Sequence, residues 1–193
     1  MLSILLPSHN ERNINLFVQE VEDVLPAHEI LIASDRTGRG KGWAVREAFQ
    51  HAKGDKIAFL DSDGDIQPRM LKRLLPFLDD YDVVVGSKRI TKAPMHRKVI
   101  TILSKIYIKF MFGLGVETQT GIKLFRREAI SDWTINGWLF DVEILAKAHK
   151  NKMRMIEIPI ETEITGSISK KVLWKTLLDS LYLKYLLLFP AKQ

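Results

Sequence analysis

Short apolar runs alternate with longer, helix-patterned segments along the first half of the chain. The apolar runs, which predict buried strands, are residues 3–6, 29–33, 57–60 and 82–85. The segments between them carry apolar residues every three or four positions and predict helices at residues 14–24, 40–53 and 70–78. Strands and helices that alternate at this pitch indicate parallel βαβ units with right-handed crossovers. The first half of the chain therefore predicts a Rossmann-like α/β fold.

The second half of the chain is less regular. It predicts a helix at residues 95–112, a short segment at 120–125, a helix at 141–150, an edge or terminal strand at 155–160 and a helix at 172–188. The last helix has a broad apolar face, and Pro190 ends it. No internal repeat, linker or low-complexity stretch occurs, so residues 1–193 predict a single domain with halves at 1–90 and 91–193.

The composition is that of an ordinary globular protein, with 46% hydrophobic and 27% charged residues among 193. The absence of cysteine excludes disulfides and thiolate metal sites and fits a reducing compartment. The apolar start at residues 1–7 is too short for a signal peptide. The bulk properties therefore exclude a disordered chain and a disulfide scaffold.

The formal net charge of +6 is unevenly distributed. No acidic residue occurs between Asp82 and Glu117, where lysines and arginines alternate with aliphatic and aromatic residues. Lysines interrupt this stretch too often for a membrane span, but the pattern suits a helix in a membrane interface, with lysines that reach the headgroups. A nucleic-acid surface is the weaker interpretation, because the aromatic residues lie among aliphatic ones at helical spacing.

Three carboxylates, Asp61, Asp63 and Asp65, follow the predicted strand at residues 57–60 directly. Carboxylates crowded at a strand end repel one another and favour a hard divalent cation with oxygen ligands. Ligands of open α/β sheets gather at the carboxyl ends of the strands, so an Asp-x-Asp there indicates a metal-bridged diphosphate. The alternative is an ordinary turn, which Asp, Ser and Gly also favour.

An ordered set of short motifs resembles one enzyme family. Asp61-Ser62-Asp63 resembles the Asp-x-Asp metal motif of family 2 glycosyltransferases, which have the GT-A fold. Further matching segments are residues 4–11, 40–46, 85–89, 120–123 and 158–160. Together these motifs cover most of the chain, and within the family they are most similar to the polyprenyl-phosphate (dolichyl-phosphate) mannose and glucose synthases.

The resemblance implies a three-layer α/β/α sandwich with a mostly parallel central sheet. It also implies a donor site for GDP-mannose or UDP-glucose, formed by Pro7, His9, Glu11, Asp35, Lys41, Asp61, Ser62 and Lys170. Asp61, Asp63 and Asp65 would hold Mg²⁺ or Mn²⁺ against the donor diphosphate. Two of these residues have plain alternatives: Glu11 as a charge that stabilises a helix N-terminus, and Lys41 as a solvated lysine in a glycine-rich turn.

The implied acceptor is a polyprenyl or dolichyl phosphate, bound by Lys88, Arg89, Arg97 and Thr101. Asp63, Lys88, Arg97 and Asp141 are the implied catalytic residues of a single inverting displacement. Amphipathic helices at about 95–112 and 170–189 would lie on the membrane. Because the chain stops at Gln193 without a membrane span, we expect peripheral, salt-sensitive attachment at the cytoplasmic face, alone or with a membrane-protein partner.

The chain departs from the family pattern in several places. Relatives usually have two aspartates followed by Gly-Ser after the second strand, whereas this chain has Asp35 as the remaining carboxylate for the nucleotide. Lys88 stands where arginine is common, and Asp65 where many mannose synthases have glutamine. The late arginine that precedes the element at Lys170 is missing, and the alignment there slips by one residue.

Asp141 leaves three interpretations open. In relatives that glycosylate hydroxyl groups, an aspartate near this point is the general base, but a phosphate acceptor is already ionised and needs none. Asp141 would then bind the donor sugar, order the site or cap a helix. Two alternative functions follow: a family 2 transferase with a hydroxyl acceptor, and a non-catalytic nucleotide-binding, membrane-associated module.

Overall fold

The computed structural model describes residues 1–8, 14–26, 28–88, 95–162 and 170–189. Its centre is a six-stranded sheet with the strand order β2-β1-β3-β5-β4-β6. The strands are β1 Leu2–Ser8, β2 Glu29–Ser34, β3 Lys56–Leu60, β4 Val83–Lys88, β5 Ile122–Arg126 and β6 Met155–Ile160. The predicted second-half strand at 155–160 therefore exists and lies at an edge of the sheet.

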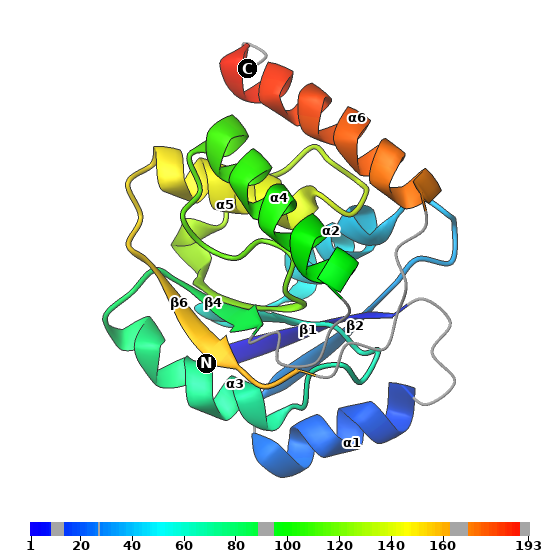
Figure 1. The fold of residues 1–193 in the computed structure, drawn as a ribbon. Coiled ribbons are helices and arrows are strands. Elements are labelled where there is room, and N and C mark those ends of the chain that lie inside the picture. The colour runs from blue at the N-terminus through cyan, green and yellow to red at the C-terminus, as the bar shows by residue number, and fades with distance from the viewer. Residues whose placement is uncertain (9–13, 27, 89–94, 163–169, 190–193) are drawn as a thin grey trace.

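Helices cover both faces of this sheet (Figure 1). The helices are α1 Ile14–Val24, α2 Lys41–His51, α3 Arg69–Leu74, α4 Met95–Phe112, α5 Phe140–Lys150 and α6 Lys170–Leu188. One buried cluster joins the sheet to α1 and α3, and a second joins its other face to α2, α4 and α5, with α6 as the outermost helix. The predicted α/β/α architecture is confirmed.

The alternation of side chains along the strands explains the two clusters. In β1, Ile4 and Leu6 pack into the cluster with α1 and α3, and Leu5 packs into the cluster with α2 and α5. In β3, Phe59 and its neighbour Leu60 divide in the same way. Successive side chains of a strand point to opposite faces, so a strand that is apolar throughout is buried on both sides.

The sheet is mostly parallel, with β5 as the exception. β5 pairs antiparallel with both β3 and β4, whereas the pairs β1–β2, β1–β3 and β4–β6 are parallel. Because Ile122 at the start of β5 pairs with Leu60 at the end of β3, the residues just before β5 lie beside the carboxyl end of β3. The antiparallel strand thus brings the residues at 120–121 to the edge where ligands of such sheets bind.

One predicted helix is divided in two. The segment predicted as a helix at 70–78 forms α3 and then a 3₁₀ helix at Leu75–Asp79. Pro76 at the start of the second element has no backbone N–H and disfavours a continuous α-helix. None of the helices described is both long and apolar enough to cross a membrane.

Candidate active site

The carboxyl ends of β1 and β3 bring three of the predicted donor-site residues together. The Ser62 hydroxyl donates a hydrogen bond to the Pro7 carbonyl, with 2.7 Å between the oxygens. The Asp61 backbone N–H donates to the Gly121 carbonyl at 2.8 Å. A Cβ atom on Gly121 would lie 2.4 Å from Asp61 Oδ2, so glycine is required there for the Asp61 carboxylate to fit.

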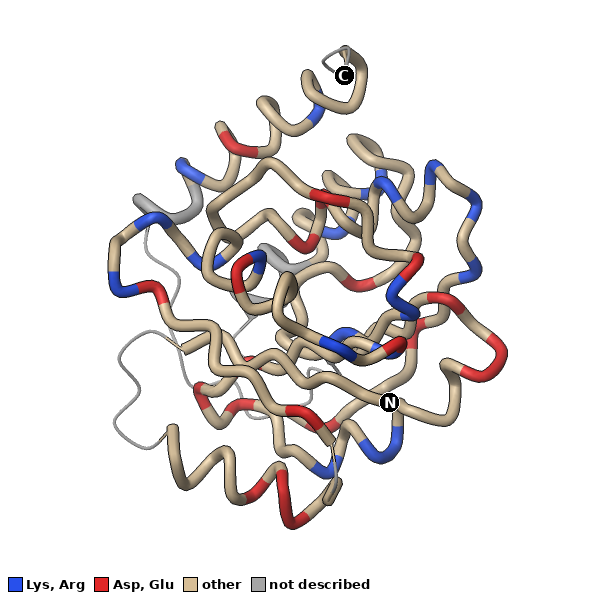
Figure 2. The backbone as a smooth tube through the Cα atoms, turned by 180° about the vertical axis from the view of Figure 1, so that it is seen from behind, with Lys and Arg blue, Asp and Glu red and all other residues tan. Residues whose placement is uncertain are grey.

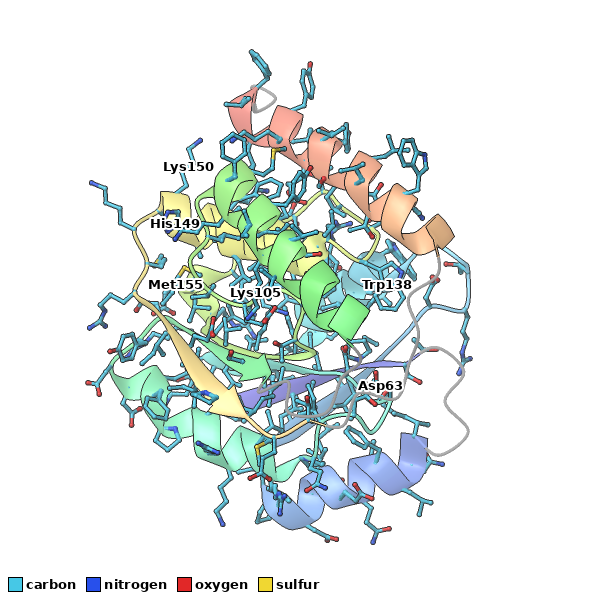
Figure 3. The ribbon with its side chains drawn as sticks, in the orientation of Figure 1. Asp63, Lys105, Trp138, His149, Lys150 and Met155 are labelled. Atoms are coloured by element: carbon cyan, nitrogen blue, oxygen red, sulfur yellow. The ribbon has the colours of Figure 1, made fainter. Side chains whose placement is uncertain are left out.

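Asp63 and Asp65 form the turn that follows. The Asp65 N–H donates to Asp63 Oδ1 at 3.1 Å, which is the hydrogen bond of an Asx turn. The pKa of Asp63 is raised, first because nearby protein displaces water around its carboxylate and then because Asp61 and Asp65 repel its charge. Its side chain, labelled in Figure 3, nonetheless remains exposed. The turn interpretation and the carboxylate cluster are therefore compatible.

Lys41 lies directly against Asp61. Its Nζ is 2.5 Å from Asp61 Oδ1, and the two side chains are only 20% and 26% exposed. The same Nζ lies 5.2 Å from the centre of the Trp138 ring, within the range of a cation–π interaction. Lys41 is thus not the solvated lysine of the alternative interpretation.

The loop that carries Trp138 is fastened to the start of α2. The Gly42 N–H donates to the Asn136 carbonyl at 2.8 Å. A Cβ atom on Gly40, which has φ +110°, would lie 2.3 Å from that same carbonyl. The two glycines therefore allow the backbones of the two loops to touch, and this contact sets Lys41 beside Trp138.

A buried carboxylate, that of Glu143, also holds the loop that carries Trp138. It is 1% exposed, and its oxygens accept the N–H groups of Thr134 and Ile135 at 2.8–3.0 Å. Lys147 Nζ lies 2.8 Å from Glu143 Oε1. Glu143 was not among the predicted site residues, although it lies only two positions after Asp141.

Asp35 is engaged within its own loop. Its carboxylate accepts the backbone N–H groups of Thr37, Arg39 and Gly40, the last at 2.5 Å. These hydrogen bonds, that from Gly40 first, lower the pKa of Asp35. Its assignment to the nucleotide stays a prediction, while its contacts show that it orders the loop leading to Lys41.

Asp141 is paired with a buried lysine. Lys123 Nζ lies 2.6 Å from Asp141 Oδ2, and the two side chains are 2% and 17% exposed. The same ammonium donates to the Thr120 carbonyl at 2.5 Å. Lys123 belongs to the matching segment at residues 120–123 but had no predicted role, because a lysine in a strand resembles a surface charge until its burial is known.

Seven predicted site residues, or their side chains, lie outside the part of the chain that the structure describes. His9, Glu11 and Arg89 lie outside the described residues, as do the side chains of Lys88, Arg97, Thr101 and Lys170. Farther along α4, Lys105 Nζ lies 2.6 Å from Oε2 of Glu117, a carboxylate that is 2% exposed. Through this ion pair, one lysine of α4 binds the helix to a buried residue of the fold.

The donor set at the strand end suits a hard divalent cation. Asp61 and Asp63 supply carboxylate oxygens, Asp63 is open to solvent, and the mutual repulsion of the carboxylates would be relieved by a cation. The described residues contain no group of three or more His, Asp or Glu side chains already arranged to hold a metal ion. A site here would therefore need further oxygens, such as those of a bound diphosphate.

The sequence profile of glycosyl transferase family 2 matches residues 18–176, and the chain belongs to this family. It is 32% identical to the dolichyl-phosphate beta-glucosyltransferase of Saccharomyces cerevisiae over 67% of this chain and 46% of that protein. It is 26% identical to the polyprenol monophosphomannose synthase of Mycolicibacterium smegmatis over 86% of this chain and 79% of that protein.

Relatives differ in length from this chain. A third relative, Glycosyltransferase AglD of Haloferax volcanii, is 26% identical over 86% of this chain and 33% of that protein. The chain thus spans less than half the length of the yeast and Haloferax relatives. The family profile matches most of this chain, but the activities named for these two longer relatives belong to the whole of each protein.

Solved structures share the fold. Glucosyl-3-phosphoglycerate synthase from Mycobacterium tuberculosis with Mg²⁺ and uridine diphosphate superposes with a TM-score of 0.74 at 14% identity. The match covers 95% of this chain and 79% of that chain. The same enzyme with Mn²⁺, UDP-glucose and phosphoglyceric acid has a TM-score of 0.71 at 15% identity, over 95% and 79% of the two chains. The predicted GT-A fold is therefore confirmed, and these neighbours have been crystallised with divalent metals.

Proposed function

We propose that the protein transfers a hexose from a nucleoside diphosphate sugar to a polyprenyl or dolichyl phosphate at a membrane surface. The observation that carries the acceptor assignment is the large apolar surface that α4 and α6 expose. The relatives named for dolichyl phosphate and polyprenol acceptors support the same lipid class. An acceptor soluble in water would not require such a surface.

The exposed apolar surface extends over both helices. Its described members are Ile102, Leu103, Ile106, Phe110, Trp174, Leu177, Leu178, Leu181, Tyr182, Tyr185 and Leu188. Phe110 is the most exposed of them, at 86%. Between Trp174 and Leu188, α6 also carries two lysines and one aspartate, and Figure 2 shows charged positions along this helix. Exposed apolar side chains gathered on neighbouring helices mark interaction sites, and an interfacial helix needs an exposed apolar face.

Polar contacts hold α4 and α6 together. The hydroxyls of Tyr107 and Ser180 are 2.7 Å apart, and Lys184 Nζ donates to the Met111 carbonyl at 2.5 Å. Leu183 is fully buried on the inner side of α6. The two helices thus turn one side toward the protein and leave their apolar residues on the outer side, as peripheral attachment to a bilayer requires.

We assign separate roles in the transfer reaction to two groups of residues. Asp61, Asp63 and Asp65 would hold Mg²⁺ or Mn²⁺, which neutralises charge on the departing diphosphate when bound. Lys88, Arg89, Arg97 and Thr101 would bind and orient the acceptor phosphate, as the resemblance implies. The ionised phosphate oxygen then displaces the nucleoside diphosphate in one inverting step without a general base.

The pairing of Asp141 with Lys123 favours a phosphate acceptor over a hydroxyl acceptor. A general base must be free to take a proton, whereas this carboxylate already accepts from a buried ammonium at 2.6 Å. We therefore assign Asp141 to ordering the site or contacting the donor sugar. The cytoplasmic face of the membrane is the side where nucleotide sugars would be available to it.

A transfer assay tests this proposal. The protein is incubated with radiolabelled GDP-mannose or UDP-glucose and polyprenyl phosphate, with and without Mn²⁺, and label is extracted into organic solvent. Metal-dependent label in the lipid phase from one donor is the expected result, and it identifies the nucleotide and the sugar together. Donor binding without lipid label would refute the lipid phosphate acceptor.

A further inference from the structure

The ammonium of Lys41 lies 2.5 Å from Asp61 Oδ1, an oxygen of the proposed cation site. We propose that Lys41 is an exchangeable counter-ion that keeps Asp61 neutralised until a nucleoside diphosphate arrives, so that divalent metal and nucleotide bind as a coupled pair. This inference rests on the proposed donor site and deepens it. It assigns a positioning role to Trp138 as well, which neither the motifs nor the comparisons assign.

The Asp61 carboxylate has little freedom to move away from Lys41. Its backbone is fixed by the hydrogen bond to the Gly121 carbonyl, and Gly121 lies against its carboxyl group. The ion pair is largely shielded from solvent, with side-chain exposures of 20% and 26%, so its attraction is stronger than that of a surface pair. A metal ion alone must therefore displace the lysine or bind beside its positive charge.

A diphosphate changes this balance because it offers Lys41 another partner. Lys41 is the first residue of α2, and its ammonium can form a charge-assisted hydrogen bond with a phosphate oxygen as it does with a carboxylate oxygen. When Lys41 turns to the diphosphate, Asp61 is released to a cation. Metal and nucleotide then strengthen each other's binding, as linkage requires.

Trp138 holds Lys41 in its resting place. The tryptophan is 61% exposed, which is costly for so large an apolar ring unless it has a partner or ligand. Its loop is fixed by Asn136, whose carbonyl accepts from Gly42, and by the buried Glu143. A loop held by these hydrogen bonds therefore places the ring 5.2 Å from the ammonium.

The test is Mn²⁺ binding to the full chain, measured by electron paramagnetic resonance with manganese chloride alone and with added UDP or GDP. For the unaltered protein we expect UDP or GDP to tighten Mn²⁺ binding at least about tenfold. Lys41→Met, and separately Lys41→Gln, should tighten binding of Mn²⁺ alone by about tenfold and reduce the effect of nucleotide to about threefold or less. Trp138→Leu should give the same changes at smaller size.

Lys72→Met on α3 is the matched control, because it removes the same charge from an exposed position on the other face of the sheet. It should leave Mn²⁺ binding unchanged. Unchanged or weaker binding of Mn²⁺ alone by folded Lys41→Met and Lys41→Gln would overturn the proposal, as would equal tightening in Lys72→Met. These readouts need no turnover, so loss of the lipid-transfer activity would refute the proposed function without touching this inference.

Discussion

The pair formed by Lys123 and Asp141 gives the sharpest test of how the site is held. Asp141→Leu removes the carboxylate 2.6 Å from an ammonium that is 2% exposed. The lysine keeps its hydrogen bond to the Thr120 carbonyl but loses its compensating charge. Breaking a buried ion pair from one side typically costs about 3–5 kcal/mol, because it leaves an uncompensated charge in the interior.

The opposite truncation should cost less. Lys123→Met removes the buried charge and leaves Asp141 unpaired but 17% exposed, so water can solvate it, and we expect a loss of about 1–2 kcal/mol. The double variant Lys123→Met with Asp141→Leu replaces both charges by apolar groups and should lose about 1 kcal/mol or less. The coupling between the two sites, the amount by which the two single losses together exceed the loss of the double variant, should therefore be about 3–6 kcal/mol.

Urea unfolding followed by circular dichroism measures these free energies, with the exposed pair Arg69 and Glu161 as the control cycle. That pair should show little coupling because its side chains are 59% and 76% exposed. Additive losses at Lys123 and Asp141 would refute the structural account. If Asp141 were a general base, Asp141→Asn would abolish transfer while Lys123→Met retained it, whereas a positioning role predicts that both lose activity.

Three further predictions concern separate parts of the molecule. Gly121→Ala places a Cβ atom 2.4 Å from Asp61 Oδ2 and should weaken Mn²⁺ binding in the presence of UDP or GDP at least about tenfold. Titration calorimetry measures this affinity. An unchanged affinity would contradict the close approach of Gly121 to Asp61. The pKa of Asp35 is lowered, so its carboxylate stabilises the 35–40 loop fully above the ordinary pKa of 3.8. This stabilisation is lost as the pH falls through the lowered pKa. The difference in melting temperature between the unaltered protein and Asp35→Ala should therefore be constant near neutrality and shrink only in acid. Phe110→Asp with Leu181→Asp should reduce sedimentation with anionic vesicles at least about tenfold at unchanged melting temperature, and undiminished binding would exclude the apolar surface as the membrane contact.

The sequence predicted most of the sheet because its strands are apolar runs. Strands buried on both faces cannot alternate with polar residues, so β1, β3 and β4 stand out against the amphipathic helices between them. The direction of β5 could not be predicted in this way. Its pairing between β3 and β4 depends on tertiary contacts, and a five-residue strand has the same apolar pattern in either direction.

The candidate site was predictable where residues are neighbours in sequence and hidden where they are not. The carboxylates at 61–65 form one local motif, and Pro7 and Ser62 belong to motifs that the resemblance identified. The ammonium partners of Asp61 and Asp141 come from other elements of the fold. Lysine side chains are usually exposed, so the sequence alone gives no sign that these two lysines are buried against carboxylates.

The Asp35 loop shows how a departure from the family pattern is accommodated. The oxygens of this single carboxylate are occupied by backbone N–H groups of its own loop, and the hydrogen bond to Gly40 ends that loop where α2 begins. The residue that the resemblance assigns to the nucleotide therefore also determines where Lys41 stands. Since Lys41 contacts Asp61, the geometry of one loop after β2 reaches the strand end where metal and diphosphate are proposed to bind. Asp35 can thus affect donor binding through the position of Lys41, without a contact of its own to the base.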